Sequence, residues 1–345
     1  MRGAAAAEMK PAIIALLLLA PQDPAALSDQ AQELAQQRRF DEAEKLWRQA
    51  LTISPGFFPA LFNLGYMKST QGKYSEAATL LAQSARADPK DFNSRYLLGQ
   101  TLSRLDRHEE ALRAWRAALT IQPANLRLMQ IIIVEYEKGR YFQEAAALAK
   151  KALAAKPDDP ELYFLAIHAY QNARDFESGL EVARLAAEQF PESARANFEY
   201  GFHLQLAGNA ELSRTYLLKA MAADPKYEEP FFFYGDLLIA QGNDEQAIPY
   251  LRQAIQNRND YREARVALAK ALMHLEKWQQ AIDELEQAIR LDPKHPEPHL
   301  LLSRIYFRMG DDQRAASEKE ISLRLRRENP TLLEAQQSRS FPAHP

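Results

Sequence analysis

The sequence predicts an all-α fold, an α-solenoid of about eight to nine helical pairs stacked along the chain. Two observations carry this prediction: proline recurs at an interval of 34 residues, and small residues stand at fixed places within each interval. Repetition at this length is typical of helix–turn–helix units, each of which buries its apolar face only against its neighbours.

The interval is marked by prolines that follow the end of a predicted helix, because proline cannot continue a helix and disfavours helical geometry in the residue before it. Successive members lie 34 residues apart, except that the last step is 68 residues and passes through Asn259. We number each unit so that this proline is position 32, and the first unit then begins at Pro24. The prolines are Pro55, Pro89, Pro123, Pro157, Pro191, Pro225 and Pro293.

Small residues occupy positions 8, 20 and 27 in nearly every unit, whereas position 24 is large in six of them. Small side chains at fixed places predict that the first helix of a unit (helix A) closely approaches the second (helix B). Ile133 and Ile167 break the rule at position 8, and we expect them to push their helices apart. Gly179 at position 20 should make room for Ile167, whereas Ala145 gives the fourth unit less relief. Position 20 reads Ala43, Ala77, Ala111, Ala145, Gly179, Ser213, Ala247, Ala281 and Ala315, and position 24 includes Trp47, Leu81, Trp115, Leu217, Leu251 and Leu285.

Glycines mark the turn inside each unit. Position 15 is glycine in four units, where a left-handed backbone conformation can end helix A. These residues are Gly72, Gly208, Gly242 and Gly310.

This pattern resembles the tetratricopeptide repeat family. The resemblance implies a right-handed superhelix with eight full repeats over residues 24–295 and a degenerate ninth repeat over 296–329. Lys319 replaces the apolar residue at position 24 of the ninth repeat, which suits a capping helix with a polar outer face. Residues 330–345 are expected to form a disordered tail. The family implies protein or peptide partners and a chain that is not an enzyme.

The resemblance also places candidate binding residues, because positions 2, 5, 9, 12 and 13 of helix A line the concave surface in this family, with position 6 at its border. In the run Phe231–Tyr234 we therefore expect Phe231 and Tyr234 in the core, and Phe232 and Phe233 at the groove. We expect two aromatic groups, one in the second and third units and one in the sixth and seventh, to hold an extended segment. The alternative is that these rings are scaffold. The candidates are Phe62, Tyr66, Tyr96, Phe164, His168, Phe198, Phe202, Phe232 and Phe233.

The sequence gives little support to a carboxylate clamp, a phosphate-binding loop or a metal site. The family's carboxylate clamp is absent, since Ser28 and Gln32 stand where its first lysine and asparagine would be. Gly65–Lys73 has the wrong spacing for a phosphate-binding loop, and the prolines between His295 and His299 oppose a helical metal site. The chain has no cysteine and a net charge of −3 without a basic stripe. We expect no cofactor, no metal, no catalysis and no nucleic-acid partner.

The N-terminus predicts export. Lys10 and a proline precede the short apolar run Ala12–Ala20, followed by small residues where a peptidase can cut. The run is too short for a stable membrane span, and Met9 is an alternative start. Residues 1–23 are thus expected to be a signal peptide or leader and the protein periplasmic or secreted; otherwise it is cytoplasmic.

We expect a binding scaffold; the alternative is an assembly component of a cell-envelope machine that docks through its convex face or termini. The oligomeric state stays open.

Overall fold

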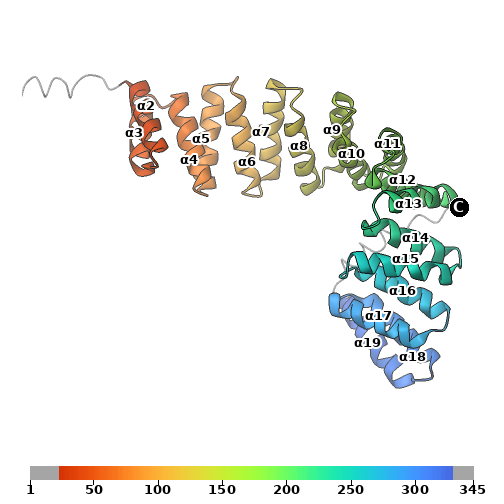
Figure 1. Cartoon of the computed structure of the whole chain (residues 1–345). Coiled ribbons are helices and arrows are strands. Elements are labelled where there is room, and N and C mark those ends of the chain that lie inside the picture. The colour runs from red at the N-terminus through yellow and green to blue at the C-terminus, as the bar shows by residue number, and fades with distance from the viewer. Residues whose placement is uncertain (1–22, 329–345) are drawn as a thin grey trace, which may run out of the picture. The chain divides into compact units, whose positions relative to one another are not determined.

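The computed structural model describes residues 23–328, and within this range the chain forms eighteen helices and no strands (Figure 1). The helices alternate as A and B helices of nine 34-residue repeats, and the two helices of every repeat pack against each other. The predicted α-solenoid of paired helices is therefore confirmed.

The chain divides into two compact units, between Lys156 and Pro157. The first contains four repeats: α2 (Pro24–Gln36) with α3 (Phe40–Ile53), α4 (Phe58–Thr70) with α5 (Tyr74–Ala87), α6 (Phe92–Ser103) with α7 (His108–Ile121), and α8 (Leu126–Lys138) with α9 (Phe142–Ala155).

The second unit contains five repeats. They are α10 (Pro160–Asn172) with α11 (Phe176–Gln189), α12 (Ala194–Leu206) with α13 (Ala210–Ala223), α14 (Glu228–Ala240) with α15 (Asp244–Asn257), α16 (Arg262–His274) with α17 (Trp278–Leu291), and α18 (Pro296–Arg308) with α19 (Asp312–Glu328).

Position 15 is left-handed in all nine repeats. The four predicted glycines have φ between 75° and 78°, and the other five repeats place a non-glycine residue there with φ between 56° and 63°. The turn closes as a Schellman motif, in which, for example, the Lys73 amide donates to the Lys68 carbonyl at 2.9 Å. The five non-glycine residues are Arg38, Asp106, Arg140, Arg174 and Glu276.

The small positions mark where helix A approaches helix B, as predicted. The hydroxyl of Ser213 at position 20 donates to the carbonyl of Gly201 at position 8, at 2.8 Å. Position 8 also faces the large side chain at position 24, because a Cβ added to Gly65 would lie 2.9 Å from Cγ of Leu81. The glycine is small because a large side chain on helix B occupies the space.

This register explains Ile133 and Ile167 and corrects one prediction. Position 24 in their repeats is Ala149 and Ala183, so the large and small residues have exchanged places. All four are buried. The atoms nearest to Gly179 belong to His203 of the next repeat, so Gly179 makes room for His203 and not for Ile167. The backbones of the helix pairs α8/α9 and α10/α11 still approach each other least of the nine pairs, as expected for the fourth repeat but not for the fifth.

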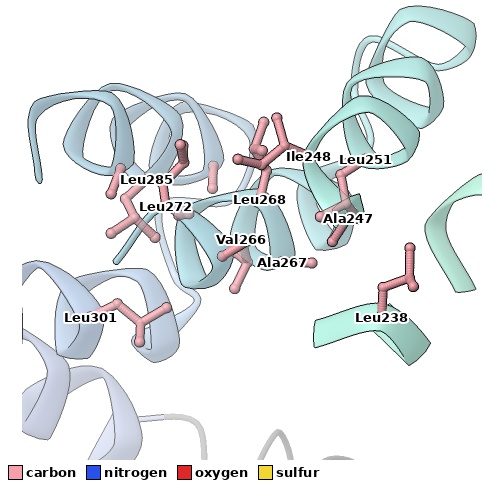
Figure 2. Close-up of a cluster of buried hydrophobic side chains, with 14 of the residues drawn as sticks. Leu238, Ala247, Ile248, Leu251, Val266, Ala267, Leu268, Leu272, Leu285 and Leu301 are labelled. Carbon is pink, nitrogen blue, oxygen red and sulfur yellow. The ribbon is translucent and has the colours of Figure 1, made fainter. Parts of the chain in front are cut away.

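The core of the second unit runs through successive helices. Figure 2 shows side chains of α14 to α18 that belong to this core. Each helix pair buries its apolar face against the next pair, as stacked repeats require. The labelled residues are Leu238, Ala247, Ile248, Leu251, Val266, Ala267, Leu268, Leu272, Leu285 and Leu301.

Successive A helices contact one another directly: α2 with α4 and α4 with α6 in the first unit, and α12 with α14, α14 with α16 and α16 with α18 in the second. Among the described residues, successive B helices meet only marginally if at all. An array whose A helices converge while its B helices spread curves with the A helices on its inner side. The inner face of these A helices is called the A-helix face below.

The termini bear on three predictions. Lys319 is exposed on α19, as a capping helix requires. Residues 1–22 of the predicted leader and the tail at 330–345 lie outside the described residues. None of the helices within residues 23–328 is long and apolar enough to cross a bilayer.

Candidate functional site

The predicted N-terminal aromatic group does not form one cluster. Phe62 stacks on Phe58 at 6.0 Å between ring centroids, and Tyr96 stacks on Phe92 at 5.7 Å, so each ring pairs within its own helix. Tyr66 is 51% exposed. Among the described residues, no ring contact joins the second repeat to the third. These three side chains lie on two neighbouring A helices without touching.

The C-terminal aromatic group does come together on α12 and α14. Phe202 lies 4.9 Å from Phe233 and 6.1 Å from Phe198, measured between ring centroids. Phe232 lies 4.9 Å from Phe233 and 5.0 Å from Tyr261, which precedes α16. These five rings, together with Tyr227, form a continuous row that we call the aromatic row.

Two predicted groove residues are buried beneath this surface. Phe198 is 7% exposed, because Phe202, Phe233 and Tyr227 surround its ring. Phe164 is 5% exposed, and the Arg195 guanidinium covers its ring at 4.0 Å. The prediction that these two rings are open to a partner is wrong.

The expected contrast between Phe231 and Phe232 is also absent. Both side chains are partly buried, and both pack against the core cluster of the second unit and against the small cluster of Ala254, Tyr261 and Ala264. Tyr234 is buried as predicted, at 4% exposed. The partly exposed phenylalanines of the aromatic row are therefore Phe202, Phe232 and Phe233.

Tyr227 and Tyr261 are members of the row that the sequence analysis missed. Both stand at position 34, the N-cap of the following A helix, and neither makes a side-chain cap hydrogen bond. In other repeats this position holds a capping side chain, such as Asp91 or Ser193. A lost cap costs about 1 kcal/mol, so tyrosine here breaks a local rule. The Tyr227 ring is partly buried against Phe198, and the Tyr261 ring is 5% exposed and packs against Phe232. Reading position 34 along the sequence would have found both.

The two histidines near this face have different surroundings. His168 on α10 is exposed, and Asn172 lies 3.4 Å from its Nδ1 atom. His203 is 1% exposed, its Nδ1 pairs with the Glu199 carbonyl at 2.9 Å, and its Nε2 side faces Gly179. Burial lowers the pKa of His203. His203 is thus a core residue that points away from the A-helix face.

Three carboxyl groups accompany the row: Glu199 on α12, and Glu229 and Asp236 on α14. Burial raises the pKa of Glu199 to about 7, against the opposing effects of Arg195 and His168. Burial also raises the pKa values of Glu229 and Asp236. The Asp236 side chain is exposed, and those of Glu199 and Glu229 are partly exposed. The surface is therefore aromatic and acidic.

The two histidines at the start of α18 make other contacts. His295 caps α18 from outside the helix, and His299 binds Glu318 at 2.7 Å. No group of three metal-ligating side chains occurs within residues 23–328.

Comparisons with known proteins agree with the fold. A family model described as "TPR repeat" matches residues 269–310, and one described as "Anaphase-promoting complex, cyclosome, subunit 3" matches 36–118 and 209–288. Combined with nine helical pairs at the 34-residue interval, these matches decide the family. The chain is a tetratricopeptide-repeat protein.

Solved structures of other repeat proteins share the architecture at low identity. The "APC/C hetero-tetramer Cut9-Hcn1" structure matches with a TM-score of 0.54 and 15% identity over 83% of this chain and 56% of that one. The Pseudomonas aeruginosa pilF structure matches with a TM-score of 0.51 and 20% identity over 63% of this chain and 96% of that one. A structure of YrrB, titled "a TPR protein with an unusual peptide-binding site", matches with a TM-score of 0.44 and 18% identity over 55% and 97%. No curated protein matches the sequence.

Proposed function

We propose that this tetratricopeptide-repeat protein is a non-catalytic scaffold that holds an extended segment of a partner protein along the A-helix face of its second unit. The observation that carries the proposal is the aromatic row, which runs from α12 across α14 to the start of α16. Exposed aromatic side chains bury a large area at little cost in conformational entropy, so they often dominate the binding energy of interfaces.

The arrangement suits an extended segment more than a small molecule. The rings follow successive A helices in a line, and the partly exposed rings on α12 and α14 offer contacts to alternate residues of a bound strand. In the first unit the corresponding rings stay separate, so the second unit is the binding region.

The proposal is tested by affinity capture from an extract of the source organism, with the wild-type chain and three variants. Phe202→Ala/Phe233→Ala removes the centre of the row. Phe202→Leu/Phe233→Leu keeps apolar bulk and shows whether the aromatic character matters. Phe176→Ala removes a ring on α11 that is 45% exposed and lies on a B helix, and it serves as the matched control.

We expect at least one protein to be captured by the wild type and by the Phe176→Ala variant, and lost with the double alanine variant. Circular dichroism and thermal melting check that the double variant keeps its helices. A partner that is retained by all variants would refute groove binding and place docking on the B helices or the termini, as a structural assembly component requires.

A further inference from the structure

The aromatic row carries negative charge that the chain leaves largely unmatched at its centre. Glu199, Glu229 and Asp236 occupy positions 6, 2 and 9 of neighbouring A helices, and all three belong to the A-helix face. Among the described residues, no hydrogen bond or ion pair reaches the carboxylates of Glu199 and Asp236, and Glu229 lies 3.6 Å from Arg258. Within the described range, the centre of the surface thus combines partly exposed rings with three carboxylates, of which Glu229 alone has a cation within 4 Å.

The surroundings of these carboxyl groups disfavour their negative charge. Burial is the main cause of the raised pKa values of Glu199, Glu229 and Asp236, and Glu229 adds repulsion on Glu199. A carboxylate with a raised pKa is stabilised by a cation that comes within about 4–6 Å. A positively charged ligand would therefore relieve a cost that the free protein bears.

Arginines of the chain itself show how this surface accepts a cation. At one edge the Arg195 guanidinium lies 4.0 Å from the Phe164 ring centroid and 3.5 Å from the Glu161 carboxylate. At the other edge Arg258 lies 3.5 Å from the Tyr261 centroid and 3.0 Å from Glu228. In both places a guanidinium stacks on a ring while a carboxylate binds it, which is a favourable site for arginine.

The rings between these two edges have no such occupant. Within the described range, the arginine and lysine groups that cover aromatic rings lie over Phe164, Tyr216, Tyr261 and Tyr306, and none lies over Phe202, Phe232 or Phe233. Lys270, whose charge opposes the raised pKa of Asp236, is itself bound by Glu297 at 2.8 Å. Among the described residues, the centre therefore offers rings and carboxylates of the same kind as the edges, without a cation stacked on its rings.

We infer that the segment bound on the aromatic row is cationic: an extended stretch of a partner protein in which arginine or lysine alternates with apolar residues. This inference rests on the proposed function, to which it adds the chemistry of the partner. The apolar residues cover Phe202, Phe232 and Phe233, and the basic residues meet the carboxylates of Glu199, Glu229 and Asp236. Complementary charge of this kind selects the partner more than it adds affinity.

The test is selection of binders from a displayed library of random dodecapeptides on the purified full-length chain. The charge variant Glu199→Gln/Glu229→Gln/Asp236→Asn removes the three carboxylates with little change in shape. Its selection is compared with those of the wild type and of the Phe202→Ala/Phe233→Ala variant described above.

A matched charge control makes the same change in net charge on the B helices. The variant Glu211→Gln/Glu245→Gln/Glu286→Gln alters exposed residues of α13, α15 and α17. It should select the same peptides as the wild type, since these residues lie away from the A-helix face.

We expect wild-type binders enriched in arginine and lysine, with about tenfold loss of affinity for the selected peptides in the charge variant, the size of one or two charge-assisted contacts. Enrichment of apolar peptides without basic residues, or of acidic ones, would overturn the inference and leave the proposed function standing. Peptides that bind the double alanine variant as well as the wild type, or the recovery of no binders, would overturn both.

Discussion

The exchange of large and small side chains in the fourth repeat predicts how the two helices of a repeat fit together. Ile133 at position 8 is 0% exposed and Ala149 at position 24 is 1% exposed. Ile133→Ala removes three carbons from this buried site and should destabilise the first unit by about 2–5 kcal/mol. Ala149→Leu adds three carbons where no space is free and should destabilise it by about 1–3 kcal/mol.

The double variant should lose much less than the sum of these two values. It recreates the pair at positions 8 and 24 of the eighth repeat, Ala269 and Leu285. Both of those residues are 0% exposed. The leucine fills the space that the isoleucine vacates, so we expect a favourable coupling of about 1–3 kcal/mol between the two substitutions.

The assay is urea denaturation followed by tryptophan fluorescence. In a Trp278→Phe background the two remaining tryptophans, Trp47 and Trp115, both lie buried in the first unit and report on its unfolding. Ala154→Leu, on the exposed side of α9, is the control and should change stability by less than about 0.5 kcal/mol. Costs that add within about 0.5 kcal/mol in the double variant would show that positions 8 and 24 do not face each other here.

Four further predictions follow from the same structure. Burial raises the pKa of Glu199 from 4.5 to about 7, so between these pH values the folded chain holds a proton that the unfolded chain releases. The free energy of unfolding should therefore fall as pH rises through this window. In urea titrations, the difference in this free energy between pH 5 and pH 8 should be smaller for Glu199→Gln than for the wild type. At position 15, Gly72→Ala should destabilise by about 1 kcal/mol and Arg140→Gly should stabilise by up to about 1 kcal/mol, since both have positive φ; thermal melts that shift in the opposite directions would contradict this. Ala111→Leu should overpack a residue that is 0% exposed and cost about 1–3 kcal/mol, and a change below about 0.5 kcal/mol in chemical denaturation would show that the repeat register is wrong. If the leader is a signal peptide, N-terminal sequencing of the cellular protein should find a start within Pro21–Leu27, whereas an intact Met1 or Met9 would exclude cleavage.

The period, the order of the helices and the packing positions of this protein were all readable from the sequence. The same residue types recur at positions 8, 20, 27 and 32 because the contacts are the same in every repeat. Helix A packs against helix B in the same way, and each repeat packs in the same way against the next. The left-handed turn at position 15 was visible only where glycine marks it. Arg140 and Glu276 adopt the same conformation because the surrounding turn imposes it.

The candidate site was predicted in part. Phe202, Phe232 and Phe233 were placed on one face by their register, and the structure brings them together. Register alone does not decide exposure. A ring on the A-helix face is covered or open depending on whether side chains of neighbouring residues or repeats pack over it. Phe198 is closed by Tyr227 from the following turn, and Phe164 by Arg195 from the next repeat.

Local sequence therefore determined the repeats. The helix contacts that define a repeat lie within it or with the next repeat, and they recur at the same interval along the chain. Only the tertiary structure decided which aromatic rings stay open and which carboxyl groups have raised pKa values. Those properties depend on side chains from adjacent repeats, which differ from one repeat to the next. Phe198 is covered by Tyr227 and Phe233, and Phe164 by Arg195, so the pattern of open and covered rings is a property of the stack and not of any single repeat.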